Sequence, residues 1–300
     1  MLSILRKIAP KFLVSWYHLV LAFAAAFLYG LPSKKLIVIG VTGTNGKSTT
    51  VEMISRILEQ DGKKTASLSS VRFRIAGKDS RNTLKMTMPG RFFVQRFLRQ
   101  ALKAGCTHAV LEITSEGILQ HRHRFINFHT AVFTNLSLEH IERHGSFEKY
   151  KQTKGELFKA AKKAHVINLD DEYAEYFLRF RADIIFGYRI PGTRTPIVGE
   201  QALQILEAKV SADEREGVRF SAGDTEFRLN LLGTFNVSNA LAAVCVGISQ
   251  GVPVKICKTA LETLQGVPGR MESGAREPFE AIVDYAFTPA ALEKVYKTLR

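Results

Sequence analysis

The sequence predicts an α/β protein of the P-loop type, with a mostly parallel sheet covered by helices on both faces and a small antiparallel hairpin region. Three observations predict it. Short apolar runs alternate with helical segments from residue 35 onward, and a glycine-rich turn joins the first run to the first helix. Between Ala208 and Leu232 the pattern changes to shorter alternating runs separated by turn residues. Strands that alternate with helices favour parallel pairing, whereas short alternating runs favour hairpins.

The elements follow one another in a regular order. The segment 47–60 has apolar residues at helical spacing, and Asp61-Gly62 ends it. The expected strands are 35–40, 108–113, 130–134 and 166–169, and the expected helices are 47–60, 90–104, 147–162, 237–250 and 254–264.

Residues 266–269 (GVPG) break the pattern and mark a domain boundary. The strand expected at 279–285 and the helix expected at 289–299 would be the first elements of the next domain. We therefore expect a hydrophobic N-terminal segment (1–33), a large central domain (34–268) and the start of a C-terminal domain (269–300).

The amino-acid composition indicates an anionic binding partner but does not identify it. The chain has 42 Lys and Arg against 28 Asp and Glu, a net charge of +14, which suits nucleotides, sugar pyrophosphates, acidic lipid or nucleic acid. Nucleic acid is the least favoured, because basic and aromatic residues do not interleave as in RNA-binding modules. Cys106, Cys245 and Cys257 show no metal-binding spacing and have apolar neighbours. We expect reduced core thiols in a cytosolic protein.

The N-terminus carries a long uncharged stretch. Residues 12–31 contain no Asp, Glu, Lys or Arg, and basic residues flank them on both sides. The length matches the ~20 residues of a membrane-spanning helix. Three arrangements stay open: a helix lying in the membrane interface, a span with the N-terminus outside, and a helix packed on the protein's own core. We favour contact of residues 12–31 with a membrane surface, and we expect a cytoplasmic protein associated with the inner face of the cell membrane.

The strongest local motif is GVTGTNGKST at residues 40–49, where an expected strand runs through a glycine-rich turn into a helix. Glycines let backbone N–H groups converge on phosphate oxygens, and the helix N-terminus favours an anion. Lys47 can reach the terminal phosphates and Ser48 can ligate Mg²⁺. Val41 stands where the strict pattern has glycine, so the loop is a variant. An ordinary glycine-rich turn is the alternative. The loop residues expected to hold the nucleotide are Gly43, Thr44, Asn45, Gly46, Lys47, Ser48 and Thr49.

Residues 43–49 (GTNGKST) resemble the loop of the Mur ligases and of their folylpolyglutamate synthetase relatives. Further segments resemble motifs of this family in the family's order, and together they extend from about residue 35 to the end of the chain. Within the family, the chain is most similar to the branch that adds the third peptide residue in peptidoglycan synthesis. The segments are LEITSEGILQHR (111–122), FTNLSLEHIERHGSFEKYKQTKGELF (133–158), LGTFNVSNA (232–240), VPGRME (267–272) and VDYAFTP (283–289).

The resemblance implies an ATP-dependent ligase that uses ATP and Mg²⁺ to join an amino acid to a UDP-N-acetylmuramoyl peptide for cell wall biogenesis. It implies a catalytic set in which Lys47 holds phosphates, Glu112 and His140 join Ser48 as metal ligands, and Lys154 is carbamylated to hold a second Mg²⁺. The positions that match substrate contacts are Thr87, Ser115, Gln120 and Arg122. The positions that match contacts to ATP are Asn236 and Asn239 near the adenine, and Arg270 and Asp284 from the hinge and the third domain.

Each of these residues also has an ordinary interpretation. Glu112 can be a polar residue at a strand end, Lys154 a surface lysine, and Asn236 and Asn239 helix caps. His140 and His144 lie four residues apart, a metal-like spacing that is usually a solvated helix face. The order of the motifs along the chain favours the functional interpretation.

The chain departs from the family pattern at single positions. Glu116 replaces a histidine, Glu139 an aspartate, Met88 a threonine and Phe287 a histidine. No expected phosphate or metal ligand is lost, so we expect nucleotide binding to be retained and details of substrate contact to differ.

Two departures concern whole domains. The hydrophobic segment stands in place of the family's UDP-binding domain, and the Rossmann-like C-terminal domain has only begun. We therefore expect a fragment or a natural short form that binds Mg-ATP and ligates poorly. Two alternatives stay open: a folylpolyglutamate synthetase-like ligase, and a noncatalytic nucleotide-binding partner subunit.

Overall fold

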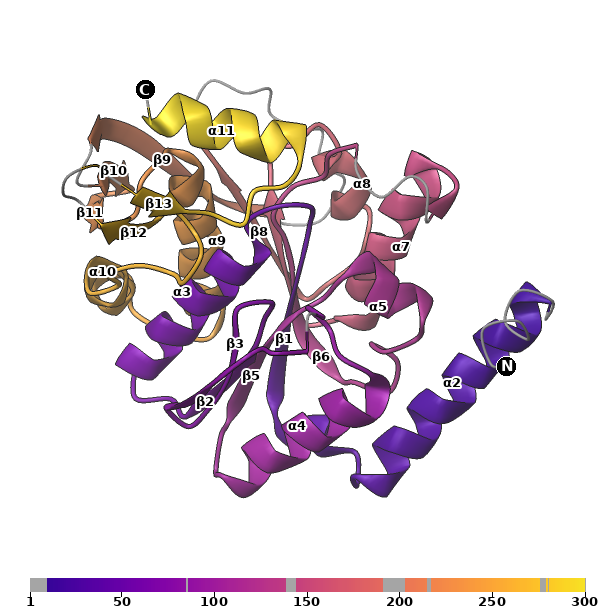
Figure 1. Ribbon diagram of the computed structural model, residues 1–300. Coiled ribbons are helices and arrows are strands. Elements are labelled where there is room, and N and C mark those ends of the chain that lie inside the picture. The colour runs from indigo at the N-terminus through magenta and orange to yellow at the C-terminus, as the bar shows by residue number, and fades with distance from the viewer. Residues whose placement is uncertain are drawn as a thin grey trace.

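A large twisted sheet forms the centre of the molecule in the computed structural model, which describes residues 10–84, 86–138, 144–190, 203–214, 217–275, 279 and 281–299 (Figure 1). The described strands form an 11-stranded sheet in the order β11-β10-β9-β8-β7-β6-β1-β5-β2-β3-β4. From β9 to β2 every neighbouring pair is parallel. The predicted α/β class with a mostly parallel sheet is confirmed.

Four strands of the large sheet were predicted, and the bounds of each agree with the prediction to within two residues. The strands of the large sheet are β1 (Ile37–Thr42), β2 (Thr65–Leu68), β3 (Arg72–Ile75), β4 (Lys78–Arg81), β5 (His108–Glu112), β6 (Phe128–Phe133), β7 (Ala164–Asn168), β8 (Ile184–Arg189), β9 (Leu203–Glu214), β10 (Gly217–Ala222) and β11 (Thr225–Leu229). A separate two-stranded sheet pairs β12 (Glu272–Ala275) with β13 (Ala281–Val283).

The helices cover both faces of the sheet. They are α2 (Lys11–Leu28), the 3-10 helix η1 (Pro32–Lys35), α3 (Lys47–Gln60), α4 (Arg91–Lys103), α5 (Ser115–Leu119), α7 (Phe147–Ala160), α8 (Ala174–Leu178), α9 (Phe235–Ser249), α10 (Val254–Glu262) and α11 (Pro289–Leu299). None of the helices within the described ranges is both long enough and apolar enough to cross a membrane.

The antiparallel strands lie at both edges of the large sheet. The hairpin region expected after Ala208 is β9–β11, and β9 pairs in parallel with β8, so these strands extend the sheet and are not a separate unit. The hairpin β3–β4 on the opposite edge was not predicted. Its sequence is dominated by charged residues and carries little apolar signal, because ion pairs to α3 hold it to the body of the protein.

The core divides into two layers because successive side chains of a strand point to opposite faces. Ile39 and Val41 of β1 pack under α3, α9 and α10, whereas Val38 packs under the layer that contains α4, α7 and α8. Cys245 and Cys257 lie within the first layer, and burial raises the pKa of the Cys257 thiol to about 12. All three cysteines are free and buried, as predicted.

Candidate active site

A cleft of about 750 Å³ opens where the central parallel strands end. Its wall contains the loop after β1, the end of β5, the segment after β6, the start of α9 and residues 267–298. In open α/β sheets ligands bind at this carboxyl edge, where loops from neighbouring strands converge. The cleft therefore collects segments that are far apart in the sequence.

The glycine-rich loop has a conformation that requires glycine. Gly43 and Gly46 have φ angles of +149° and +81°. A Cβ at Gly46 would lie 2.3 Å from Asn239 Oδ1, and one at Gly43 would lie 2.0 Å from Thr134 Oγ1. α3 begins at the next residue, Lys47, so its N-terminal amides adjoin the loop. Close packing and positive φ together fix a loop that can present backbone N–H groups to phosphate.

Two neighbouring residues after β6 hold this loop, although sequence reasoning gave them no role. Asn135 Oδ1 accepts a hydrogen bond from Asn45 N at 2.9 Å, and Asn135 Nδ2 donates to Asn45 O at 3.0 Å. Thr134 Oγ1 donates to the same carbonyl at 2.7 Å. The available signal was the FTNL segment, in which a polar pair directly follows a buried strand.

The expected phosphate and metal residues meet beside the loop. Ser48 Oγ donates to Glu112 Oε2 at 2.8 Å, and Lys47 Nζ lies 3.9 Å from Glu112 Oε1. Lys47 Nζ also donates to Thr44 O at 2.6 Å. Both Ser48 and Glu112 are buried. Lys47, Ser48 and Glu112 therefore form one cluster on the cleft wall.

Ser70 and Arg270 complete this cluster from distant parts of the chain. Ser70 N donates to Glu112 Oε2 at 2.9 Å, and the Ser70 and Ser48 hydroxyls are 2.7 Å apart. Arg270 Nη2 donates to Ser48 Oγ at 3.3 Å and to Ser70 Oγ at 3.4 Å. Arg270 was expected to reach the nucleotide. No sequence motif indicated Ser70.

The oxygen donors of the cluster fit a magnesium ion. Mg²⁺ prefers oxygen ligands and is usually held by one or two carboxylates together with substrate phosphates. The Glu112 carboxylate and the Ser48 hydroxyl provide two such oxygens beside the phosphate loop. Within the described ranges, no group of three or more His, Cys, Asp and Glu side chains gathers as a metal site. His140 lies outside the described residues, so its expected role as a metal ligand stays a prediction.

Lys154 lies behind the loop. Its side chain is 2% exposed, and Nζ donates to Gly43 O at 2.7 Å. The amine also lies 4.6 Å from the centre of the Tyr150 ring, whose hydroxyl is 3.1 Å from Thr44 Oγ1. The interpretation of Lys154 as a solvated surface lysine is therefore wrong. Its carbamylation stays a prediction.

The residues expected near the adenine form a second wall of the cleft. Asn239 Nδ2 donates to Asn236 Oδ1 at 2.9 Å, and Asn239 Oδ1 accepts from Thr50 Oγ1 at 3.3 Å. Both asparagines are buried and lie within α9, so neither is its N-cap. Asp284 also lines the cleft, where its carboxylate accepts from Met271 N at 2.8 Å and from Ala286 N at 2.7 Å.

The four residues expected to contact the substrate divide into two pairs. Thr87 and Ser115 lie on the described wall of the cleft, whereas Gln120 and Arg122 do not. Arg122 is buried, donates to Gln120 Oε1 at 2.7 Å and also contacts the carbonyl of Met88. Arg122 therefore supports the segment that contains Thr87.

His144 is buried beside this segment. Its Nε2 lies 3.0 Å from the Ser115 hydroxyl, so His144 does not belong to a solvated helix face.

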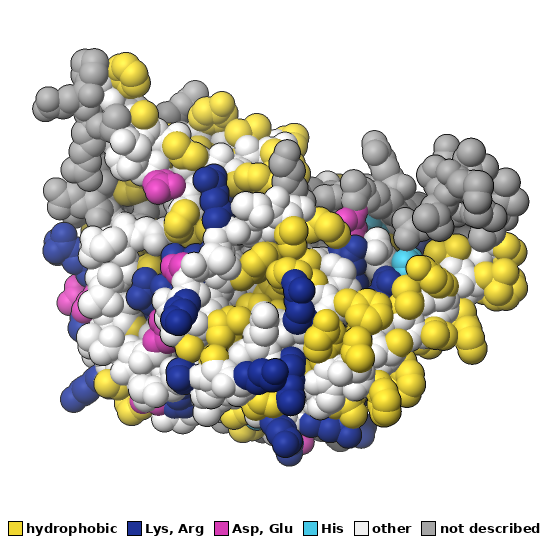
Figure 2. Space-filling model, turned by 60° about the horizontal axis from the view of Figure 1, so that its bottom comes forward, with side chains coloured by type: hydrophobic (Ala, Val, Ile, Leu, Met, Phe, Trp, Pro, Cys, Tyr) yellow, Lys and Arg dark blue, Asp and Glu magenta, His cyan; other side chains and the backbone are white. Residues whose placement is uncertain are grey.

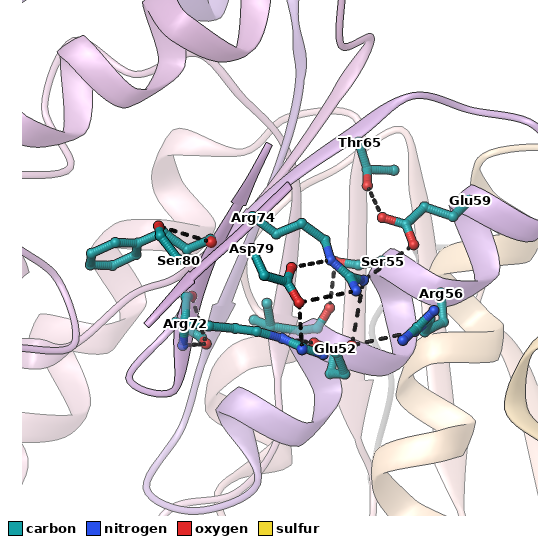
Figure 3. Close-up of polar contacts among 12 residues, drawn as sticks. Glu52, Ser55, Arg56, Glu59, Thr65, Arg72, Arg74, Asp79 and Ser80 are labelled. Carbon is teal, nitrogen blue, oxygen red and sulfur yellow. Dashed lines mark hydrogen bonds and ion pairs between the residues drawn. The ribbon is translucent and has the colours of Figure 1, made fainter. Parts of the chain in front are cut away.

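An ion-pair network joins the β3–β4 hairpin to α3 (Figure 3). Glu52 of α3 accepts from Arg72 Nε at 3.2 Å and lies 3.6 Å from Arg74 Nη1. Arg74 Nε donates to Asp79 Oδ1 at 2.6 Å. The hairpin begins two residues after Ser70. The network therefore fixes the turn that delivers the Ser70 amide to Glu112.

Comparison with known proteins gives one consistent family. Residues 41–247 match the family model described as the Mur ligase middle domain. The UDP-N-acetylmuramyl-tripeptide synthetase of Roseiflexus sp. (strain RS-1) is 35% identical over 97% of this chain and 59% of its own length. The UDP-N-acetylmuramoyl-L-alanyl-D-glutamate--2,6-diaminopimelate ligase of Syntrophomonas wolfei is 34% identical over 93% of this chain and 57% of its own length.

Solved structures agree with this assignment. A UDP-N-acetylmuramoyl-L-alanyl-D-glutamate--2,6-diaminopimelate ligase matches with a TM-score of 0.72 at 29% identity, over 88% of this chain and 53% of that one. The Mycobacterium tuberculosis folylpolyglutamate synthase has a TM-score of 0.75 at 18% identity, over 94% and 70%, and this likeness concerns the fold alone. The chain spans less than two thirds of the length of the curated relatives named above. By its family match and its fold, this chain belongs to the Mur ligase family.

Proposed function

We propose that this protein supplies the ATP-binding core of an amide ligase that phosphorylates a carboxylate and joins it to an amine. The observation that carries this proposal is the cluster of Lys47, Ser48, Glu112 and Arg270 beside a glycine loop in one cleft. Two cationic side chains and two metal-compatible oxygens around a phosphate loop suit the handling of a triphosphate.

In the proposed reaction, a carboxylate oxygen of the acceptor attacks the γ-phosphorus of ATP. The bond to the oxygen bridging the β- and γ-phosphates breaks, ADP leaves, and an acyl phosphate forms. The amine of an amino acid then attacks the acyl carbon, phosphate leaves, and an amide remains after the amine loses a proton.

The chain's residues lower the barrier in distinct ways. Lys47 and the loop amides neutralise charge on the β- and γ-phosphates, and Arg270 brings a second cation to Ser48. Mg²⁺ held by Ser48 and Glu112 would supply further charge neutralisation. The cleft holds the reactants together, which converts a bimolecular step into one within a complex.

The substrate we propose is a UDP-N-acetylmuramoyl peptide, together with an amino acid, in peptidoglycan precursor synthesis. This proposal is supported by the printed names of the relatives at 34–35% identity. Thr87 and Ser115 on the cleft wall are the proposed substrate contacts. The proposed site of action is the cytoplasm, with residues 12–31 against the inner face of the cell membrane.

Nucleotide binding provides the first test. We expect the unsubstituted chain to bind ATP more tightly with Mg²⁺ than without it, and Ser48→Ala to weaken Mg-ATP binding by roughly tenfold to a hundredfold. Ser55→Ala is the matched control, because Ser55 lies on the same helix and its hydroxyl donates to Val51 O, away from the cleft. Equal ATP affinity with and without Mg²⁺ in all three proteins would contradict the metal assignment.

Ligation provides the second test. The chain is incubated with ATP, a UDP-N-acetylmuramoyl dipeptide and individual amino acids, and ADP release is measured alongside a folate substrate. Release that requires the UDP-linked peptide supports the proposal, and release that requires folate overturns the proposed substrate. ATP binding without phosphoryl transfer, even with the C-terminal region of a relative added as a separate protein, would indicate a noncatalytic nucleotide-binding subunit.

A further inference from the structure

The helix α2 presents its bulky side chains outward and its small ones inward. Its buried positions are His18, Ala22, Ala25 and Ala26. Figure 2 shows the resulting row of apolar side chains along the helix. A surface helix normally buries its large apolar residues, so this orientation leaves a face suited to a partner. The most exposed large residues of α2 are Phe12, Trp16, Phe27 and Leu28, each about 70% exposed.

Specific contacts hold α2 in this orientation. His18 Nδ1 lies 2.6 Å from Arg91 Nη2, and Ser15 Oγ lies 2.7 Å from His121 Nε2. These two contacts come from the same side of the helix as the buried alanines. The outward direction of the aromatic row is therefore fixed by the body of the protein.

The surface next to this row is cationic. No Asp or Glu occurs in residues 1–51 or in residues 80–111, the two segments that contain α2 and α4. A groove of about 430 Å³ lies where α2 ends beside α4, and its wall combines Phe27 and Leu28 with Arg96, Arg99 and Lys103. Lys and Arg side chains border the apolar row in Figure 2. Apolar side chains beside an acid-free cationic groove match the two layers of a lipid surface, acyl chains and anionic headgroups.

We propose that α2 and α4 dock this protein on an anionic lipid bilayer, with the aromatic row in the acyl boundary and the groove on headgroup phosphates. This deepens the membrane contact of the proposed function but does not require ligase activity. Trp and Tyr rings favour the membrane interface, and basic side chains are attracted to anionic leaflets. A second copy suits the face less well, because a symmetric contact would bring two cationic grooves together.

The docked orientation leaves the cleft accessible. α2 and α4 lie in the lower part of the molecule in Figure 1, whereas α11, which lines the cleft, lies at the top. Vesicle binding and nucleotide binding should therefore be independent.

Trp16 makes the test direct, because it is the chain's single tryptophan and lies on the proposed docking face. Its fluorescence is measured as the 300-residue protein is titrated with phosphatidylcholine vesicles, with or without phosphatidylglycerol. We expect a blue shift and quenching by brominated lipid only when phosphatidylglycerol is present, and weaker binding at high salt. The readout needs no ATP or substrate, so it distinguishes failure of docking from failure of the ligase proposal.

Two pairs of substitutions separate local charge from total charge. Arg96→Gln with Lys103→Gln should weaken vesicle binding by roughly thirtyfold, since each basic group near an anionic surface contributes a several-fold effect. Lys209→Gln with Lys255→Gln removes the same charge from exposed positions on β9 and α10, and should leave binding nearly unchanged.

Three results would overturn the docking proposal. They are Trp16 emission that does not respond to phosphatidylglycerol, equal weakening by the two double variants, and a Trp16 shift that depends on protein concentration without lipid. The last result would assign the face to a second copy of the chain.

Discussion

Glu52→Gln is the substitution whose effect follows most directly from the geometry. Glu52 is 4% exposed and lies among three guanidinium groups: Arg72 Nε at 3.2 Å, Arg56 Nε at 3.4 Å and Arg74 Nη1 at 3.6 Å. The amide keeps the shape of the side chain but removes its charge. Asp79 still pairs with Arg72 and Arg74, so the substitution leaves an excess of buried positive charge.

The expected loss of stability lies at the lower end of the range for a buried ion pair. Breaking a buried pair costs about 3–5 kcal/mol, whereas an exposed pair contributes about 0–1 kcal/mol. The Arg56 side chain is 42% exposed and contributes little, while the Arg72 and Arg74 side chains are 18% and 8% exposed. We therefore expect a loss of about 3 kcal/mol, or a melting temperature lower by roughly 6 °C.

Thermal unfolding followed by circular dichroism measures this effect. Glu156→Gln is the control, because Glu156 pairs with Arg124 and Lys159 on the surface and should change the melting temperature little. Combining Glu52→Gln with Arg74→Met should cost less than the sum of the single changes, because removing Arg74 relieves part of the excess positive charge that Glu52→Gln leaves. Equal melting temperatures for Glu52→Gln and the unsubstituted protein would refute the reasoning.

Three further results are expected. Gly46→Ala should weaken ATP binding at least tenfold, because its Cβ would lie 2.3 Å from Asn239 Oδ1. Gly62→Ala is the control: it has φ +78° and no atom within 4 Å of its Cβ, so it should add backbone strain alone. Equal ATP affinities of the Gly46→Ala and Gly62→Ala variants would contradict the packing argument. With ¹³C-labelled bicarbonate, a carbamate resonance should appear in the unsubstituted chain and be missing from Lys154→Gln, and its absence from both would refute carbamylation. Burial lowers the pKa of His123 from 6.5 to about 3, so the unfolded chain takes up the proton first and stability is lost as pH falls below 6.5. Without this histidine, His123→Phe should lose stability less steeply below pH 6.5, by up to a factor of ten in the folding equilibrium constant per pH unit. Chemical unfolding at several pH values measures this, and the same pH dependence in both proteins would contradict the prediction.

Features with a local cause were predictable from the sequence. The bounds of α3 and α11 agree with the predicted segments 47–60 and 289–299. For α3 the cause is local, because its helical periodicity lies within the segment and Asp61-Gly62 directly follows it. The phosphate loop was equally visible, since a loop of this type is made from consecutive residues. The phosphate and metal roles of Lys47 and Ser48 could therefore be predicted from the sequence alone.

Features that depend on distant partners required the tertiary structure. Ser70 reaches Glu112 only because a charged hairpin is held to α3, and Arg270 reaches Ser48 across more than 200 residues. The sequence showed that the N-terminal stretch is uncharged, but it did not determine which side of α2 is buried. That side depends on the surface to which Ser15 and His18 bind, because burial is a property of two surfaces in contact and not of one segment.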